Sequence, residues 1–189
     1  MGERSSIGQT AQLLPADAAA MLKAAGVAIQ TTVAAMPPAL LTWRPAPGEW
    51  CVLEVLGHLI ETEERGFAGR VRAILAEERP RLSGWDPDAV ARERRDAERE
   101  PAEVLGEFLR RRAASVALVE TVTAADLERG GDHPEVGFLA IGDLLHEWVH
   151  HDANHFRQIL ANVQGYAWPG MGNARRFSDP SGPGEPERE

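Results

Sequence analysis

Residues 142–159 read GDLLHEWVHHDANHFRQI, and they contain four of the six histidines of the chain within ten positions. The stretch has no proline, so we expect it to belong to one long helix over about residues 138–163. At about 100° per residue, one row of this helix begins and ends with apolar residues and carries two histidines between them. The row consists of Ile141, Leu144, Trp148, His151, His155 and Ile159. The other two histidines, His146 and His150, align with a polar row and are expected at the surface.

Three more helices are predicted from the positions of prolines and from apolar residues that recur at helical spacing. No internal repeat and no convincing strand pattern accompanies them. The sequence therefore predicts an all-α fold, a four-helix bundle. The helices are expected over residues 16–36, 51–78, 101–122 and 138–163, with loops over residues 40–50, 79–87 and 130–137.

The length of 189 residues, with 43% hydrophobic and 26% charged side chains, fits one globular domain. We expect the bundle to cover residues 15–165, after a flexible N-terminus over residues 1–14. Residues 166–189 are rich in glycine, proline, serine and charge, which predicts a largely disordered tail. The charged run over residues 91–100 has no apolar face and is expected to be an exposed linker or a short surface helix.

Composition also excludes several classes of function. A formal net charge of -9 repels nucleic-acid phosphates and anionic lipid heads, so neither nucleic acid nor a membrane is an expected partner. No apolar run reaches the roughly 18 to 20 residues of a membrane span, and no secretory signal is recognisable, so a cytoplasmic location is expected. Because Cys51 is the one cysteine, neither an internal disulfide nor a cysteine-rich zinc cage can form.

A metal site is the chemistry that the histidines favour. His151 and His155, at i and i+4, have β-carbons roughly 5 to 6 Å apart, so both imidazoles can reach one ion. HxxxH alone is weak evidence, and a third ligand is required. The candidate is His58, in the second predicted helix. Periodicity by itself places His58 on an exposed row with Glu54, although a cleft at the rim of the bundle would still receive it.

Four other side chains lie where they can contribute to such a site or remain in solvent. Asp152 and Gln158 flank the histidine row and can orient the second ring nitrogen of a ligand, as groups around metal ligands usually do. The simpler interpretation, favoured for Asp152, is that they face water. Glu147, one turn before His151, can act as an acid or base, although an exposed helix glutamate is commoner. His133 lies in a loop of glycines and proline and is expected to be solvated.

Two stretches resemble the DinB/YfiT-like family of metalloenzymes. They are WRPAPGEWCVLEVLGHL, which ends at His58 and Leu59, and GDLLHEWVHHDANHFRQI, which contains His151 and His155. The order of the parts also agrees over about residues 16–165: a tryptophan-bearing loop, a helix with one histidine, a spacer, and a helix with HxxxH. The resemblance implies a four-helix bundle in which His58, His151 and His155 bind a divalent metal ion in a cleft.

Three neutral imidazoles leave an open coordination position, which a catalytic metal needs. The resemblance further implies transfer of low-molecular-weight thiols to electrophiles, or isomerisation with thiol help, as in some members of the family. The leading hypothesis is a divalent-metal-dependent enzyme acting on a small molecule, a thiol S-transferase or a hydrolase. Zinc or nickel is the expected metal, and a low-molecular-weight thiol is a candidate cosubstrate.

Two other interpretations of the cluster stay open. One is a non-catalytic metal- or ligand-binding bundle that serves as an interaction module, and the other is a polar helix surface that binds no metal. The long last helix and the alanine-rich first helix each offer an apolar strip to a second copy of the chain, so a homodimer is also expected.

Overall fold

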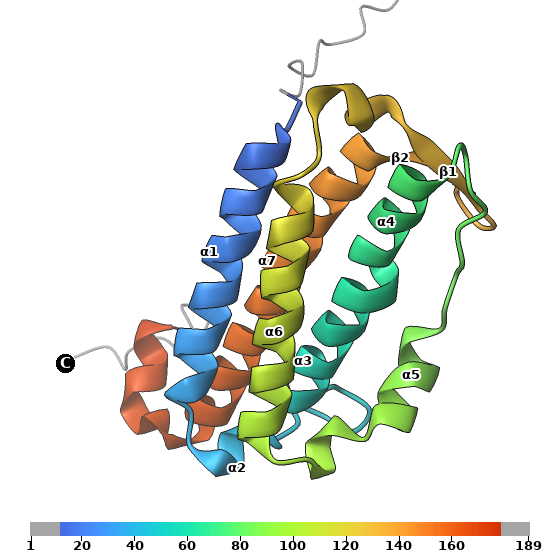
Figure 1. Cartoon of the computed structure of the whole chain (residues 1–189). Coiled ribbons are helices and arrows are strands. Elements are labelled where there is room, and N and C mark those ends of the chain that lie inside the picture. Colours follow the sequence, from blue (N-terminus) through green and yellow to red (C-terminus); the bar gives the residue numbers. More distant parts are fainter. Residues whose placement is uncertain (1–11, 179–189) are drawn as a thin grey trace, which may run out of the picture.

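The structure, a computed structural model, describes residues 12–178 and is dominated by four long helical rods (Figure 1). The rods are α1 (Pro15–Ala34), α3 (Val52–Glu61) continued by α4 (Ala68–Ala76), α6 (Pro101–Val119) and α7 (Ile141–Ala167). In Figure 1, α1 and α7 run in one direction. The rod made of α3 and α4 runs in the opposite direction, as does α6. Because α1 and α3 each pack against both α6 and α7, the rods close a bundle. The predicted all-α four-helix bundle is confirmed.

A two-stranded antiparallel hairpin at one end of the bundle corrects the prediction of a fold without strands. Its strands are β1 (Gly130–His133) and β2 (Gly137–Ala140). The sequence predicts a loop over residues 130–137 followed directly by a helix, but α7 begins only at Ile141. The glycines that indicate a loop serve instead to let the strands approach closely. A Cβ on Gly130 would lie only 2.3 Å from the carbonyl oxygen of Leu139.

The helix predicted over residues 51–78 is interrupted by a π-helical turn, η1 (Thr62–Gly66), between α3 and α4. The amide of Phe67 donates to the carbonyl oxygen of Thr62 at 2.7 Å, so this hydrogen bond spans five residues. The extra residue rotates the following helix by roughly 100° relative to the preceding one. Side chains that one regular helix over residues 51–78 would place in a single row therefore lie on different faces before and after the turn.

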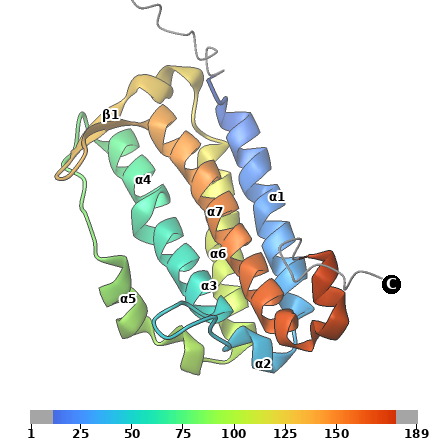
Figure 2. The ribbon, with the colours of Figure 1, turned by 180° about the vertical axis from the view of Figure 1, so that it is seen from behind.

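The charged run over residues 91–100 is only partly the surface element that the sequence predicts. It begins in α5 (Pro87–Arg94), a short helix beside α3 (Figure 2), and continues into the 3-10 turn η2 (Asp96–Glu98). The Arg94 guanidinium donates to the carboxylates of Glu61 and Asp96 at 2.8 and 2.7 Å, and Asp96 is only 1% exposed. These charges leave solvent because they pair with each other, which an apolar pattern cannot reveal.

Buried polar side chains divide the core into two apolar clusters, and each rod contributes to both. The larger side chains at the hairpin end are Leu22, Phe67, Val119 and Trp148. Those at the opposite end, near α2 (Pro38–Leu41), are Ile29, Leu56, Phe108 and Ile159. Between the clusters lies a polar layer, which we define as Glu63, Arg112, Ser115 and Asp152; none of them is more than 4% exposed.

The segment after α7 differs from the predicted disordered tail, because Trp168–Phe177 forms the 3-10 helical stretch η4. The Arg175 guanidinium donates to the carbonyl oxygen of Trp168 at 3.1 Å and lies over its indole ring, 5.5 Å from the ring centroid. Just before this stretch, Tyr166 packs edge-on against Trp43 at 5.8 Å. Aromatic contacts thus hold a segment whose glycine and proline content is typical of a tail.

Some expectations from the sequence concern residues or properties that the structure does not describe. Of the predicted flexible N-terminus and tail, residues 1–11 and 179–189 lie outside the described residues. Within residues 12–178, no helix combines the length and the apolar character needed to cross a membrane. The homodimer, the cytoplasmic location and the exclusion of nucleic-acid and membrane partners stay predictions.

Replacing Gly57 by alanine tests the contact between α3 and the charged segment. The added Cβ would lie 1.8 Å from Oδ2 of Asp96, so Gly57→Ala should lower the free energy of unfolding in urea by about 1–3 kcal/mol. Gly106→Ala on α6 is the matched control, because its Cβ would meet only the flexible end of Arg110, at 3.4 Å. Alanine is the better helix former by about 1 kcal/mol, so the control should be neutral or stabilising. Equal stability of the two variants would contradict the close packing.

Candidate metal centre

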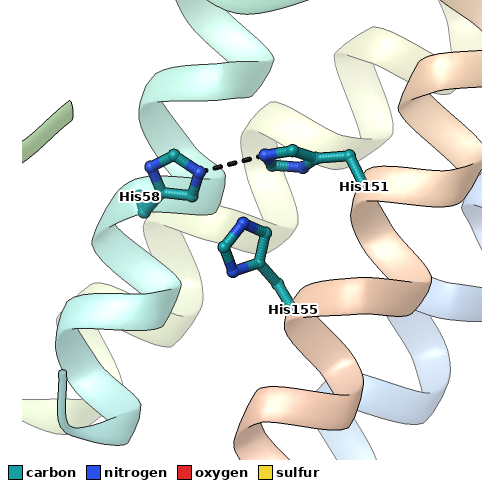
Figure 3. Close-up of side chains that lie close together, drawn as sticks. All are labelled: His58, His151 and His155. Atoms are coloured by element: carbon teal, nitrogen blue, oxygen red, sulfur yellow. Dashed lines mark hydrogen bonds between the residues drawn. The ribbon is translucent and has the colours of Figure 1, made fainter. Parts of the chain in front are cut away.

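Three histidines from two rods converge beside the polar layer (Figure 3). His58 lies on α3, and His151 and His155 lie one turn apart on α7. Nε2 of His58 is 3.0 Å from Nε2 of His151, and one ring nitrogen from each of the three histidines lies within 4.8 Å of the other two. The structure thus brings together, from positions far apart in the chain, the three residues that the sequence analysis takes as candidate ligands.

The spacing of the nitrogens suits a single ion. Two nitrogens that are each about 2.0–2.1 Å from a metal lie about 2.9–3.4 Å apart when the angle between their bonds is about 90–110°. The 3.0 Å between the Nε2 atoms of His58 and His151 falls within this range. Imidazole nitrogen is a ligand that zinc, copper, iron and nickel all accept. The donor set therefore fits a transition-metal ion.

Aromatic rings enclose the cluster. The ring of His58 lies 5.1 Å from that of Trp50 and 5.7 Å from that of Trp85, measured between centroids. On the other side, Phe67 meets the ring of His151 at 5.2 Å with its plane nearly perpendicular. His58 is consequently 9% exposed, although helical periodicity by itself places it on a solvent-facing row. The error arises because Trp85, from the segment before α5, covers that face of α3.

The imidazoles are held in the neutral state that metal binding requires. Burial, together with the charge of the neighbouring His155, lowers the pKa of His58 to about 3. Burial and the same neighbour also lower the pKa of His151 to about 3, and burial lowers the pKa of His155. Protons therefore compete weakly for these nitrogens near pH 7.

The second ring nitrogens have unequal surroundings. Nδ1 of His155 lies 2.9 Å from Oε1 of Gln158; with its hydrogen on Nδ1, this imidazole donates to the amide and leaves Nε2 for an ion. Nδ1 of His58 and Nδ1 of His151 are buried and have no hydrogen-bond partner among the described residues. The orientation of these two rings therefore depends on packing against the aromatic side chains rather than on hydrogen bonds.

Behind the histidines, Arg112 binds two carboxylates. Its guanidinium makes a two-pronged contact with Asp152, with Nη2 2.9 Å from Oδ1, and Nε donates to Oε1 of Glu63 at 2.8 Å. Nη1 also donates to the carbonyl oxygen of Leu22 on α1, at 2.7 Å. Burial raises the pKa of the Asp152 and Glu63 carboxyl groups. Asp152 stands between His151 and His155 in the chain, so this ion-paired group anchors the helix that carries both.

These contacts correct two expectations and place a third residue away from the histidines. Asp152 faces neither water nor a histidine ring nitrogen, because it binds Arg112. His133, the last residue of β1, is not solvated but 7% exposed, and its Nε2 lies 3.1 Å from Nη2 of Arg70. Glu147 is exposed and lines a pocket on the hairpin side of Phe67.

The residues that support the site were not predicted from the sequence. Arg112 is the clearest case, because it interrupts an apolar row of α6 between Phe108 and Val119, where a charged side chain calls for a buried partner. Glu63 offers no comparable signal, since its inward position depends on the π-helical turn. His146 and His150 are exposed, and His146 accepts a hydrogen bond from the Leu13 amide at 3.1 Å.

Comparisons with known proteins agree with this fold. The family model of the DinB superfamily matches residues 21–159, well over half of the chain. No curated protein matches the sequence. Among solved structures, YfiT from Bacillus subtilis superposes with a TM-score of 0.75 at 20% sequence identity, over 89% of this chain and 96% of that chain. That protein is described as a probable metal-dependent hydrolase with an unusual four-helix bundle topology. At this identity, the likeness shows the shared fold.

The lowered histidine pKa values predict how the metal-free protein responds to acid. Between about pH 6.5 and 3, His58 and His151 bind protons in the unfolded chain but stay neutral in the folded one, so stability is lost as pH falls. Each histidine should change the free energy of unfolding by up to about 1.4 kcal/mol per pH unit. Urea unfolding of chelator-treated protein measures the slope, and the His58→Asn, His151→Asn double variant should have a shallower one. Parallel slopes would show that these imidazoles do not carry the effect.

Proposed function

Because the chain belongs to the DinB superfamily, we propose that it is a divalent-metal-dependent enzyme that acts on a small molecule at its three-histidine cluster. The observation that carries this proposal is the convergence of His58, His151 and His155 as neutral imidazoles, with nitrogens close enough for one ion. Three protein ligands leave room for a further one, as catalytic sites require and closed structural sites do not. Zinc and nickel are the metals proposed, since both accept imidazole nitrogen.

The surrounding residues of the chain have distinct parts in this function. Gln158 holds the ring of His155 through Nδ1, and the ion pair between Arg112 and Asp152 fixes the segment of α7 between the two ligands. Trp50 and Trp85 limit the access of water and offer apolar faces to a substrate. Low water content strengthens every electrostatic interaction inside such a site.

The proposed reaction is attack of an activated nucleophile on a small electrophile. A bound divalent ion supplies the activation by lowering the pKa of a coordinated water or thiol toward about 7. The chain does not provide the nucleophile through Cys51, because burial raises the pKa of that thiol to about 11. Water would make the protein a hydrolase, in keeping with the description given to YfiT. A low-molecular-weight thiol as cosubstrate would make it a thiol S-transferase.

Metal binding is the first property to test. His151→Ala should lower the affinity for Zn²⁺ or Ni²⁺ at least about 100-fold, because it removes a ligand and leaves two. Elemental analysis of protein purified without a histidine tag, followed by competition with a chelator, measures this. His150→Ala is the matched control, since His150 is the next residue on the same helix but is exposed. Equal metal content in the wild type, the control and His151→Ala would contradict the assignment.

Turnover is the second property, and it separates an enzyme from a binding module. The metal-loaded protein should hydrolyse small esters or amides, or conjugate cellular thiols to an electrophile such as a halogenated nitrobenzene. His151→Ala should abolish the activity, and His150→Ala should retain it. Stoichiometric metal without turnover in either assay would instead support the non-catalytic metal- or ligand-binding bundle.

A further inference from the structure

A pocket lies near the three-histidine cluster, beside the hairpin. Its volume is about 400 Å³, which is within the range of small-molecule sites. Apolar side chains make up much of its wall, and two nitrogen-bearing side chains reach into it. Its lining includes Phe67, just before α4, Arg70 from α4, His133 from β1, Leu139 from β2, and Asp143, Leu144 and Glu147 from α7.

Arg70 has a positive charge without a matching carboxylate. Unlike Arg94 and Arg112, it forms no ion pair with any of the residues 12–178. Its Nη2 donates to the carbonyl oxygen of Ser83 at 3.2 Å, while its Nε is buried and has no partner in that part of the chain. Burial lowers the pKa of this guanidinium, and only the more distant Glu135 raises it. A half-buried cationic side chain with spare N–H groups is suited to bind an anion.

His133 is surrounded by hydrogen-bond donors on both sides of its ring. The backbone amide of Glu135 points at Nδ1 from 3.3 Å, and Nη2 of Arg70 points at Nε2 from 3.1 Å. A neutral imidazole has one bare nitrogen and one N–H, so one of these two contacts sets a donor against a donor. If Nδ1 accepts from the Glu135 amide, Nε2–H and the Arg70 guanidinium converge as two donors. An oxygen with lone pairs, bound between them, satisfies both.

This pocket adjoins the three-histidine cluster. Phe67 lines the pocket, and its ring lies 5.2 Å from that of His151, measured between centroids. On α7, Glu147 lies one turn before His151, which is about 6 Å along the helix axis. The segment that supplies the Ser83 carbonyl to Arg70 also supplies Trp85 to His58. Phe67 is therefore a wall that the pocket and the cluster share.

We propose that Arg70 and His133 form an anion subsite that holds the carboxylate of the substrate, while its reactive group lies at the three-histidine cluster. The subsite rests on the proposed function for its place in a reaction, but the binding of the carboxylate does not depend on it. Phe67, Leu139 and Leu144 contact the apolar body of the molecule. The exposed carboxylates of Asp143 and Glu147, which both line the same pocket, disfavour a second negative charge, so the substrate class is a monocarboxylate with an apolar body.

Isothermal titration calorimetry with phenylacetate tests the subsite in the full chain, both metal-loaded and chelator-treated. The wild type should bind phenylacetate and not the uncharged phenylacetamide, and Arg70→Gln should raise the Kd at least tenfold. Arg72→Gln is the matched control: Arg72 lies on the same helix but is exposed, and its guanidinium donates to the backbone of Glu64. His133→Asn removes the Nε2 donor and should also weaken binding. If Arg70→Gln lowers the melting temperature of the protein, His133→Asn provides an independent test of the subsite.

The outcomes separate this proposal from the metal site. Equal binding of phenylacetate by Arg70→Gln and Arg72→Gln, equal binding of the amide, or no binding by the wild type would overturn the subsite. Binding that survives Arg70→Gln but is lost in His151→Ala would also overturn it, because the carboxylate would then be a ligand of the metal. Binding that requires Arg70, in a protein that takes up neither Zn²⁺ nor Ni²⁺ when these are supplied, would support the subsite and contradict the proposed function.

Discussion

The buried guanidinium of Arg112 is the constraint on which the centre of this bundle depends. A charge at 4% exposure is costly unless it is fully paired, and Arg112 is paired with Glu63, Asp152 and the Leu22 carbonyl oxygen. Its side-chain stem passes so close to Gly26 that a Cβ there would lie 3.0 Å from it. One side chain of α6 thereby fixes α1, the π-helical turn and α7 relative to one another.

The three-histidine cluster depends on this arrangement. Asp152 lies between His151 and His155 in the sequence, so its contact with Arg112 sets the rotation of α7 and with it the direction of both imidazoles. Glu63 fixes the turn that follows the helix of His58. The three histidines themselves gain little from hydrogen bonds, since within residues 12–178 only His155 has a partner for its second nitrogen, and aromatic packing completes their support.

Segments outside the four rods close the site. The run from the end of α4 to η2 contributes Trp85 over His58 and Ser83 to Arg70, and its Arg94 forms ion pairs with Glu61 and Asp96. The hairpin contributes His133 to the neighbouring pocket. In the sequence both segments resemble linkers, because neither has an apolar face. Ion pairs and close backbone contacts stabilise them instead. Functional residues commonly lie on connecting segments of this kind, which a rigid scaffold holds in place.

Local spacing in the sequence determined the four rods and the shared row of His151 and His155, because the 3.6-residue period of a helix fixes which side chains lie on one face. It also assigned the remaining histidines of α7, His146 and His150, to the surface. Only the tertiary structure decided the burial of His58, the pairing of Asp152 and the enclosure of His133. In each case the partner comes from a segment distant in the chain, so no periodicity within one helix records it.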